Sequence, residues 1–143
     1  MLLHDEVCKL ECDVDDCSGE ILGYTLERLL EAGALDVHYT PVYMKKNRPA
    51  WELTVLCHGQ KREALEEIIF RETTTIGIRR TLMQRDILPR ERGEVQTEYG
   101  AVQVKLCGAN CYVEYDSAAK IARAQGVALQ KIYDAVRKAE KRH

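Results

Sequence analysis

The stretch LECDVDDCSGE, residues 10–20, decides the fold of the first half of the chain. Up to residue 15 its even-numbered side chains are apolar and its odd-numbered side chains are acidic, which is typical of a strand that buries one face. A helix is expected to follow, with Asp16 or Ser18 capping its free amide groups. Three carboxylates on one strand face repel each other, so we expect solvent, cationic side chains or a bound cation beside them. Carboxylate oxygens suit hard divalent ions such as Mg²⁺ or Mn²⁺.

Outward from this stretch, the hydrophobic pattern switches between the strand period and the helix period. Strands are predicted at 7–15, 35–44, 50–57 and 73–82, and helices at 18–32 and 61–70. The order β-α-β-β-α-β is that of the split β-α-β, or ferredoxin-like, arrangement, in which two helices cover one face of an antiparallel four-stranded sheet. We therefore predict a ferredoxin-like domain over residues 1–90, and α+β as the fold class.

The remaining residues, 91–143, are predicted to form a smaller subdomain after the polar stretch PRERG at 89–93. Apolar residues alternate on both sides of Gly100, which indicates a β-hairpin. Asp116 or Ser117 can cap a first helix that Gly126 ends, and a second helix is expected over 129–136. The subdomain is thus expected to combine a hairpin with two helices.

Composition excludes several classes of protein. The chain has 143 residues, with 21 Lys and Arg against 23 Asp and Glu, so its net charge of −2 gives no general attraction to nucleic acid or acidic membranes. No signal peptide and no stretch long enough to span a bilayer is recognisable, so we expect a cytoplasmic protein with no membrane or nucleic-acid partner. In that compartment the six cysteines are expected to be reduced and mostly buried, and their spacing lacks the two-residue spacer of common zinc sites.

Two further segments carry cations and hydroxyl groups. KKNRP at 45–49 puts three cations at a predicted turn, and RETTTIGIRR at 71–80 combines three arginines, three threonines and a glycine. A solvated hairpin tip and a threonine-rich strand are the plain structural alternatives. Beside a carboxylate cluster, however, such donors suit a nucleoside triphosphate held with a divalent cation. The glycine pattern of a P-loop or a dinucleotide site is absent from the sequence.

The acidic stretch supplies the candidate metal ligands, of which any subset can serve: Asp13, Asp15, Asp16 and Glu20. Capping of the helix accounts for one or two of these acids, but not for the whole row. The sequence identifies no catalytic residue, because no Ser-His-Asp or Cys-His arrangement is visible at local spacing.

Together, four motifs resemble the C-terminal half of the nickel insertion proteins of lactate racemase maturation. They are ECDVDD with Glu20, LLEAGALDV at 29–37, MKKNRP at 44–49 and FRETTTIGIR at 70–79. The resemblance runs from about Val7 to Val136. It departs from the family at Asp13, where an asparagine is common.

The resemblance implies a CTP-dependent nickel insertase, a cyclometallase of the lyase class. Such an enzyme inserts Ni²⁺, its substrate, into pyridinium-3,5-bisthiocarboxylic acid mononucleotide to form the nickel-pincer nucleotide, with CTP hydrolysis and Mn²⁺ or Mg²⁺. The CTP contacts it implies are Lys45, Lys46, Asn47, Arg48, Arg71, Thr73, Thr74, Thr75 and Arg79. It also implies a homo-oligomer, and activity is expected to need the N-terminal half of the insertase.

Two other functions stay open from the sequence. A ferredoxin-like domain can sense a small ligand without catalysis. The stretch AAKIARAQGVALQKIY at 118–133 also has the pattern of a helix-turn-helix, which DNA-binding proteins use, although any tightly crossed helix pair shares that pattern.

Overall fold

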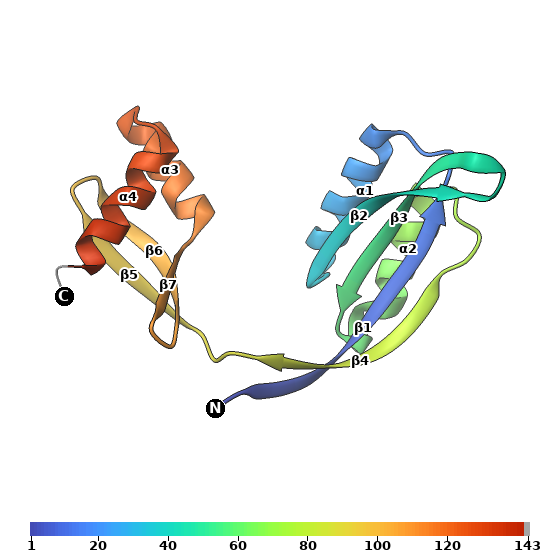
Figure 1. The fold of residues 1–143 in the computed structure, drawn as a ribbon, viewed down its shortest axis with the longest axis horizontal. Coiled ribbons are helices and arrows are strands. Elements are labelled where there is room, and N and C mark those ends of the chain that lie inside the picture. Colours follow the sequence, from blue (N-terminus) through green and yellow to red (C-terminus); the bar gives the residue numbers. More distant parts are fainter. Residues whose placement is uncertain (142–143) are drawn as a thin grey trace. The chain divides into compact units, whose positions relative to one another are not determined.

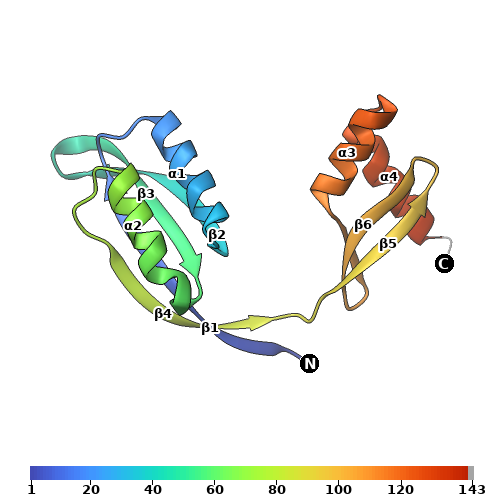
Figure 2. The same cartoon turned by 180° about the vertical axis from the view of Figure 1, so that it is seen from behind.

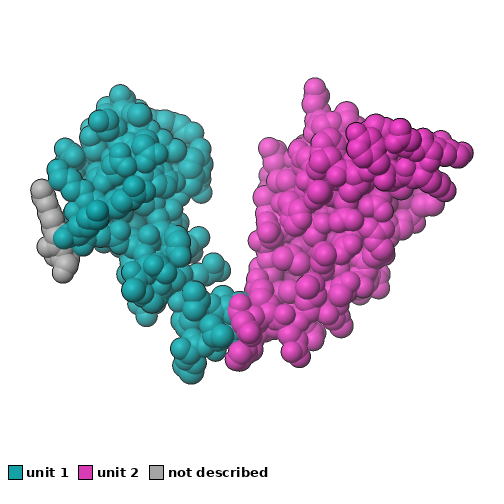
Figure 3. All heavy atoms as spheres, viewed as in Figure 1, with its two compact units in different colours: residues 1–3, 87–143 teal, residues 4–86 magenta. Residues whose placement is uncertain are grey.

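The computed structural model describes residues 1–141. The chain divides into two compact units, one made of His4–Asp86 and the other of Met1–Leu3 with Ile87–His143 (Figure 3). Among the described residues, no helix is long and apolar enough to cross a membrane.

The unit His4–Asp86 contains a four-stranded sheet and two helices. Its elements are β1 (Leu3–Val14), α1 (Gly19–Glu31), β2 (Asp36–Met44), the 3₁₀ turn η1 (Lys45–Asn47), β3 (Arg48–Cys57), the 3₁₀ turn η2 (Gly59–Lys61), α2 (Arg62–Glu72) and β4 (Arg79–Ile87). The strand order is β2-β3-β1-β4, and β3 runs antiparallel to both β1 and β2. Both helices cover the same face of the sheet (Figure 1 and Figure 2), which confirms the predicted ferredoxin-like arrangement.

The acidic strand has the predicted two faces. Even-numbered side chains from Cys8 to Val14 are at most 2 % exposed and share a hydrophobic core with Leu29 of α1 and with Leu65 and Ile69 of α2. Odd-numbered side chains from 9 to 13 are only half-buried and point to the helix-free face. The apolar half of the alternation therefore holds the two layers together, and the acidic half is left for the other face.

The helix α1 begins at one of the two caps predicted for it. Ser18 is the N-cap, and its hydroxyl oxygen accepts a hydrogen bond from the Ile21 amide at 3.3 Å. The alternative prediction, that Asp16 caps this helix, was wrong. The Asp16 carboxylate instead accepts a hydrogen bond from the Thr74 hydroxyl. After the helix, Gly33 has a φ of +104°, a conformation that favours glycine.

The fourth strand begins later than predicted. Residues 73–78 form a loop, because the Thr73 hydroxyl donates to the carbonyl of Ile69 at 2.7 Å and accepts from the Thr75 amide at 3.3 Å. These bonds hold the chain at the end of α2, in place of pairing with a strand. The prediction of a strand from Thr73 was therefore wrong, and β4 runs from Arg79 to Ile87.

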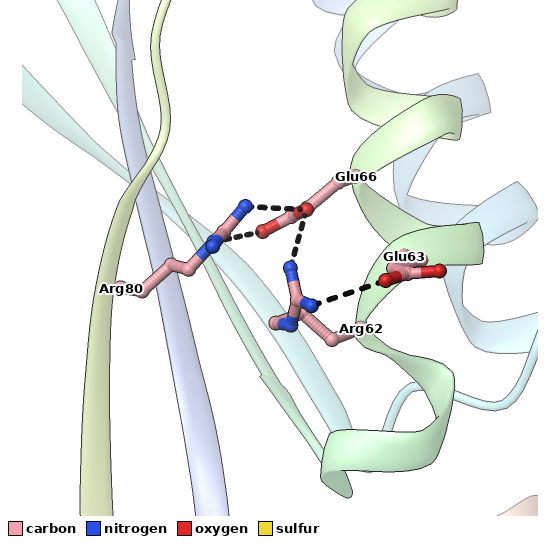
Figure 4. Close-up of polar contacts among 4 residues, drawn as sticks. All are labelled: Arg62, Glu63, Glu66 and Arg80. Atoms are coloured by element: carbon pink, nitrogen blue, oxygen red, sulfur yellow. Dashed lines mark hydrogen bonds and ion pairs between the residues drawn. The ribbon is translucent and has the colours of Figure 1, made fainter.

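A buried carboxylate ties α2 to the edge strand β4. Glu66 is 8 % exposed, and it accepts hydrogen bonds from Arg80 at 2.5 and 3.0 Å and from Arg62 at 3.0 Å (Figure 4). Arg62 also donates to Glu63 at 3.3 Å. The bond to Glu66 raises the pKa of Arg80 above its usual range. Because every charged group here has a partner of opposite charge, the network stabilises the contact between helix and strand.

The second unit contains a three-stranded antiparallel sheet and a helix pair. Its elements are β5 (Glu91–Thr97), β6 (Gly100–Cys107), β7 (Asn110–Val113), α3 (Tyr115–Gln125) and α4 (Leu129–Glu140), with strand order β5-β6-β7. Val102 and Val104 of β6 pack with Ala118 of α3 and Ile132 of α4 in a separate core. The predicted hairpin and both predicted helices are confirmed.

Details of this unit differ from prediction. The strand β7 was not predicted, and it pairs with β6 from Val104↔Val113 to Cys107↔Asn110. Neither Asp116 nor Ser117 caps α3, because the helix already begins at Tyr115. Ser117 instead accepts a hydrogen bond from the Gln103 amide at 2.9 Å, which ties α3 to β6.

The six cysteines are free thiols. Cys8, Cys12 and Cys57 are buried, and the other three are half-buried. Burial raises the pKa of the Cys57 thiol to about 11, so this thiol stays protonated near neutral pH. These side chains thus behave mainly as small apolar residues of the core.

Candidate functional site

The loops that carry the predicted site lie at one end of the sheet in the unit His4–Asp86. They are residues 15–18 after β1, the η1 turn between β2 and β3, and residues 73–78 before β4. Antiparallel pairing of β1 with β3, and of β3 with β2, brings the ends of β1 and β2 beside the start of β3 (Figure 1). The fold therefore gathers the acidic segment and both cationic segments.

Arg79, the first residue of β4, binds carboxylates on the helix-free face of the sheet. Its Nη1 and Nη2 atoms donate to Asp13 at 3.1 and 3.4 Å, its Nε lies 3.8 Å from Glu11 Oε2, and its Nη2 lies 3.6 Å from Glu52 Oε2. The hydrogen bonds to Asp13 raise the pKa of Arg79 above its usual range, so it is always charged. Lys9 Nζ lies 2.6 Å from Glu11 as well. Cationic side chains, one of the expected remedies, thus neutralise part of the acidic row.

The next two acids contact the other two segments. Arg48 Nη1 lies 3.4 Å from Asp15 Oδ2, and the Thr74 hydroxyl donates to Asp16. Each contact joins a predicted metal ligand to a predicted nucleotide contact. Glu20 is exposed in the first turn of α1, at the same end of the sheet.

The three threonines take different positions. Thr73 is 9 % exposed, and its hydroxyl is occupied by the end of α2. Thr75 is half-buried and donates to the Gly77 carbonyl at 3.0 Å. Burial raises the pKa of the nearby Cys12 thiol, and a hydrogen bond with Thr75 partly offsets this rise. Thr74 is exposed, as is Arg71 in the last turn of α2. Of the three threonine side chains, that of Thr74 is therefore the most exposed, and its hydroxyl proton is donated to Asp16.

The η1 turn has an unusual backbone. Lys46 and Asn47 have φ angles of +61° and +57°, and neither is glycine. Asparagine tolerates this left-handed conformation, whereas lysine does so at a cost. Lys45, Lys46, Asn47 and Arg48 are all exposed, so the strained turn presents three cations to solvent.

This strain can be measured with two variants that both remove the amino group of Lys46. Lys46→Gly is expected to be more stable to unfolding than Lys46→Ala by about 0.5–1 kcal/mol, because only glycine relieves the strain. Urea unfolding followed by the fluorescence of Trp51, the single tryptophan, reports on this unit. Equal stability of the two variants would show that the turn stores no strain.

The carboxylates do not form a ready-made metal cage. Among residues 1–141, no group of three or more His, Cys, Asp or Glu side chains is close enough to hold a metal ion. Three of the acids of the site instead contact arginine or threonine: Asp13, Asp15 and Asp16. Carboxylate oxygens remain the donors that Mg²⁺ and Mn²⁺ prefer, and Mg²⁺ usually takes only one or two of them together with phosphate oxygens.

Sequence reasoning missed Glu52 as part of this region. It lies opposite Asp13 in the register of β1 and β3. The sequence places Glu52 in the predicted third strand, but only the register of the strand pairing places it beside Asp13.

Comparison with known proteins bears on this arrangement. Residues 1–133 match the nickel insertion protein family. The chain belongs to this family. Within it, the chain is 50% identical over 141 residues to the pyridinium-3,5-bisthiocarboxylic acid mononucleotide nickel insertion protein of Acetivibrio thermocellus, covering 96% of this chain and 35% of that protein. It is 46% identical over 137 residues to the protein of the same name from Alkaliphilus metalliredigens, covering 93% and 32%.

A solved structure also resembles this nickel insertion family member closely. It is LarC2, the C-terminal domain of a cyclometallase involved in the synthesis of the NPN cofactor of lactate racemase, in its apo form. The TM-score is 0.90 at 40% identity, and the match covers 96% of this chain and 98% of that chain. The chain spans about one third of the length of the curated relatives and has the fold of that C-terminal domain.

Proposed function

We propose that this chain is the part of a nickel insertase that binds CTP and a divalent cation. In this proposal the complete enzyme inserts Ni²⁺, its substrate, into pyridinium-3,5-bisthiocarboxylic acid mononucleotide and hydrolyses CTP, as a cyclometallase of the lyase class. Membership of the nickel insertion protein family and the similarity to LarC2 support the reaction. Because the chain spans about one third of the length of its curated relatives, the proposed partners include an N-terminal half of the insertase as well as the pyridinium mononucleotide substrate.

The observation that carries the nucleotide part is the meeting of three segments at one end of the sheet. Exposed cations come from η1 and from the end of α2, and an exposed hydroxyl comes from Thr74. Carboxylates of the acidic segment touch both groups of donors, through Asp15–Arg48 and Asp16–Thr74. A triphosphate needs cations and short neutral donors on one side and a metal bound by oxygen ligands on the other.

The donor chemistry fits Mn²⁺ or Mg²⁺ bound together with the nucleotide. The proposed ligands are Asp15 and Asp16, with Asp13 and Glu20 beside them, and triphosphate oxygens complete the coordination. The cation, when bound, neutralises phosphate charge. The side chains of this chain bind and orient the triphosphate: Lys45, Lys46, Arg48, Arg71 and Arg79 by charge, and Asn47, Thr74 and Thr75 by hydrogen bonds, while Thr73 holds the loop in place.

We also include a homo-oligomer in the proposal. The edge strand β4 exposes Leu82 and Met83, at 69% and 41%, which suits contact with another copy of the chain.

Calorimetric titration tests the nucleotide part of this proposal. With Mn²⁺ present, we expect CTP to bind about tenfold or more tightly than ATP, a preference that one or two hydrogen bonds to the base edge can supply. GTP serves as a second comparison. Equal affinity for CTP and ATP would contradict the assignment of CTP, and absence of binding to any of the three nucleotides would contradict a triphosphate site.

A further inference from the structure

Two of the aspartates proposed to bind the metal each form an ion pair with an arginine proposed to bind phosphate. Arg48 Nη1 lies 3.4 Å from Asp15, and Arg79 donates to Asp13 through two nitrogens, at 3.1 and 3.4 Å. The arginine side chains are 53% and 54% exposed. Water and salt screen such pairs, so a ligand can exchange with either partner.

Transfer of an arginine from its aspartate to a phosphate creates electrostatic repulsion that must be neutralised. An arginine that turns to a phosphate leaves its aspartate without a partner, beside the added negative charges of the triphosphate. Like charges at this distance repel, which opposes binding of the bare nucleotide. A divalent cation removes the repulsion, because it binds the released carboxylate and a phosphate oxygen together.

The described residues do not form a metal site that could bind the cation before the triphosphate. Among the described residues, no three ligating side chains are grouped closely enough to hold a metal ion. One or two carboxylates usually bind Mg²⁺ together with substrate phosphate oxygens. The arginines are held by those same carboxylates. Binding of the cation and binding of the triphosphate are thus coupled through the two ion pairs.

We propose that Asp15, through Arg48, and Asp13, through Arg79, are positioning residues that make triphosphate binding depend on a divalent cation. This inference rests on the proposed function and adds the condition under which the nucleotide binds. It predicts that removing Asp15 releases Arg48 and strengthens the binding of metal-free CTP.

The test is titration of the folded chain with CTP, once with a chelator and once with saturating Mn²⁺, at constant ionic strength. For Asp15→Asn, affinity for metal-free CTP is expected to rise about two- to fivefold, the range that one exposed ion pair accounts for. Affinity for CTP with Mn²⁺ is expected to fall, so the ratio of the two dissociation constants shrinks. Asp13→Asn is expected to change metal-free binding in the same direction but by less, because Arg79 keeps its ion pairs with Glu11 and Glu52.

Asp36→Asn is the matched control, because it also removes one exposed carboxylate, at the start of β2 away from the loops. It measures the effect of net charge alone. If Asp15→Asn weakens binding with Mn²⁺ and leaves metal-free binding equal to that of the control, Asp15 is only a metal ligand and the inference is overturned. If the unchanged chain binds no triphosphate even with Mn²⁺, the proposed function itself fails. The gain in metal-free affinity cannot come from a misfolded variant, so it supports the inference directly.

Discussion

Replacing Glu66 by alanine is expected to lower the free energy of unfolding of the unit His4–Asp86 by about 2–3 kcal/mol. Glu66 is 8 % exposed and accepts hydrogen bonds from both Arg62 and Arg80. Without Glu66, Arg80 loses its carboxylate partner, whereas Arg62 keeps its contact with Glu63. Removing one partner of a buried ion pair destabilises strongly. The loss of stability is expected to be smaller than for a fully buried ion pair, because both arginine side chains reach solvent, at 27% and 56% exposed.

Glu63→Ala is the matched control on the same helix. Its side chain is 82% exposed and contacts only Arg62 in this network, so the expected loss is about 0.5 kcal/mol or less. Urea unfolding followed by Trp51 fluorescence measures both variants, and Trp51 packs edge-on against Tyr39 within the same unit. Equal losses for the two variants would show that Glu66 does not hold α2 to β4.

The part of the fold that could be predicted depends on local pattern. The alternation of the acidic strand specifies which side chains are buried, and Ser18 lies where a cap is needed, so both follow from neighbouring residues alone. The loop at 73–78 could not be predicted in this way. Its threonines favour strands by composition, but the Thr73 hydroxyl bonds to the end of α2 instead.

The candidate site shows the same division. The sequence indicates the three segments, because each has an unusual density of charges or hydroxyl groups. It does not indicate which residues of the three segments contact each other. Arg79 pairs with Asp13, 66 positions away in the chain, and with Glu52, which lies beside Asp13 only because of the register of β1 and β3. Charge patterns along a chain therefore predict which segments form a site, whereas the contacts between them require the fold.

The second large effect is expected from the double variant Lys45→Ala with Arg71→Ala. Both side chains are exposed, and among residues 1–141 neither makes an ion pair with an acid, unlike Arg48 and Arg79. They can therefore contact phosphate without first releasing a carboxylate. A hydrogen bond to a charged group contributes about 1.5–3 kcal/mol, so each loss is expected to weaken binding about tenfold or more.

The two losses are expected to add to about 100-fold, because the residues lie on different segments. Calorimetric titration with CTP and saturating Mn²⁺ measures the effect. Arg28→Ala with Lys61→Ala is the matched control, since it removes one arginine and one lysine at the ends of α1 and η2 away from the three loops. If the control weakens binding as much as the test variant, net charge alone attracts the nucleotide and the end of the sheet is not its site. If only the test variant does so, cations without acid partners supply most of the attraction, and the paired arginines add to it once a divalent cation has taken their aspartates.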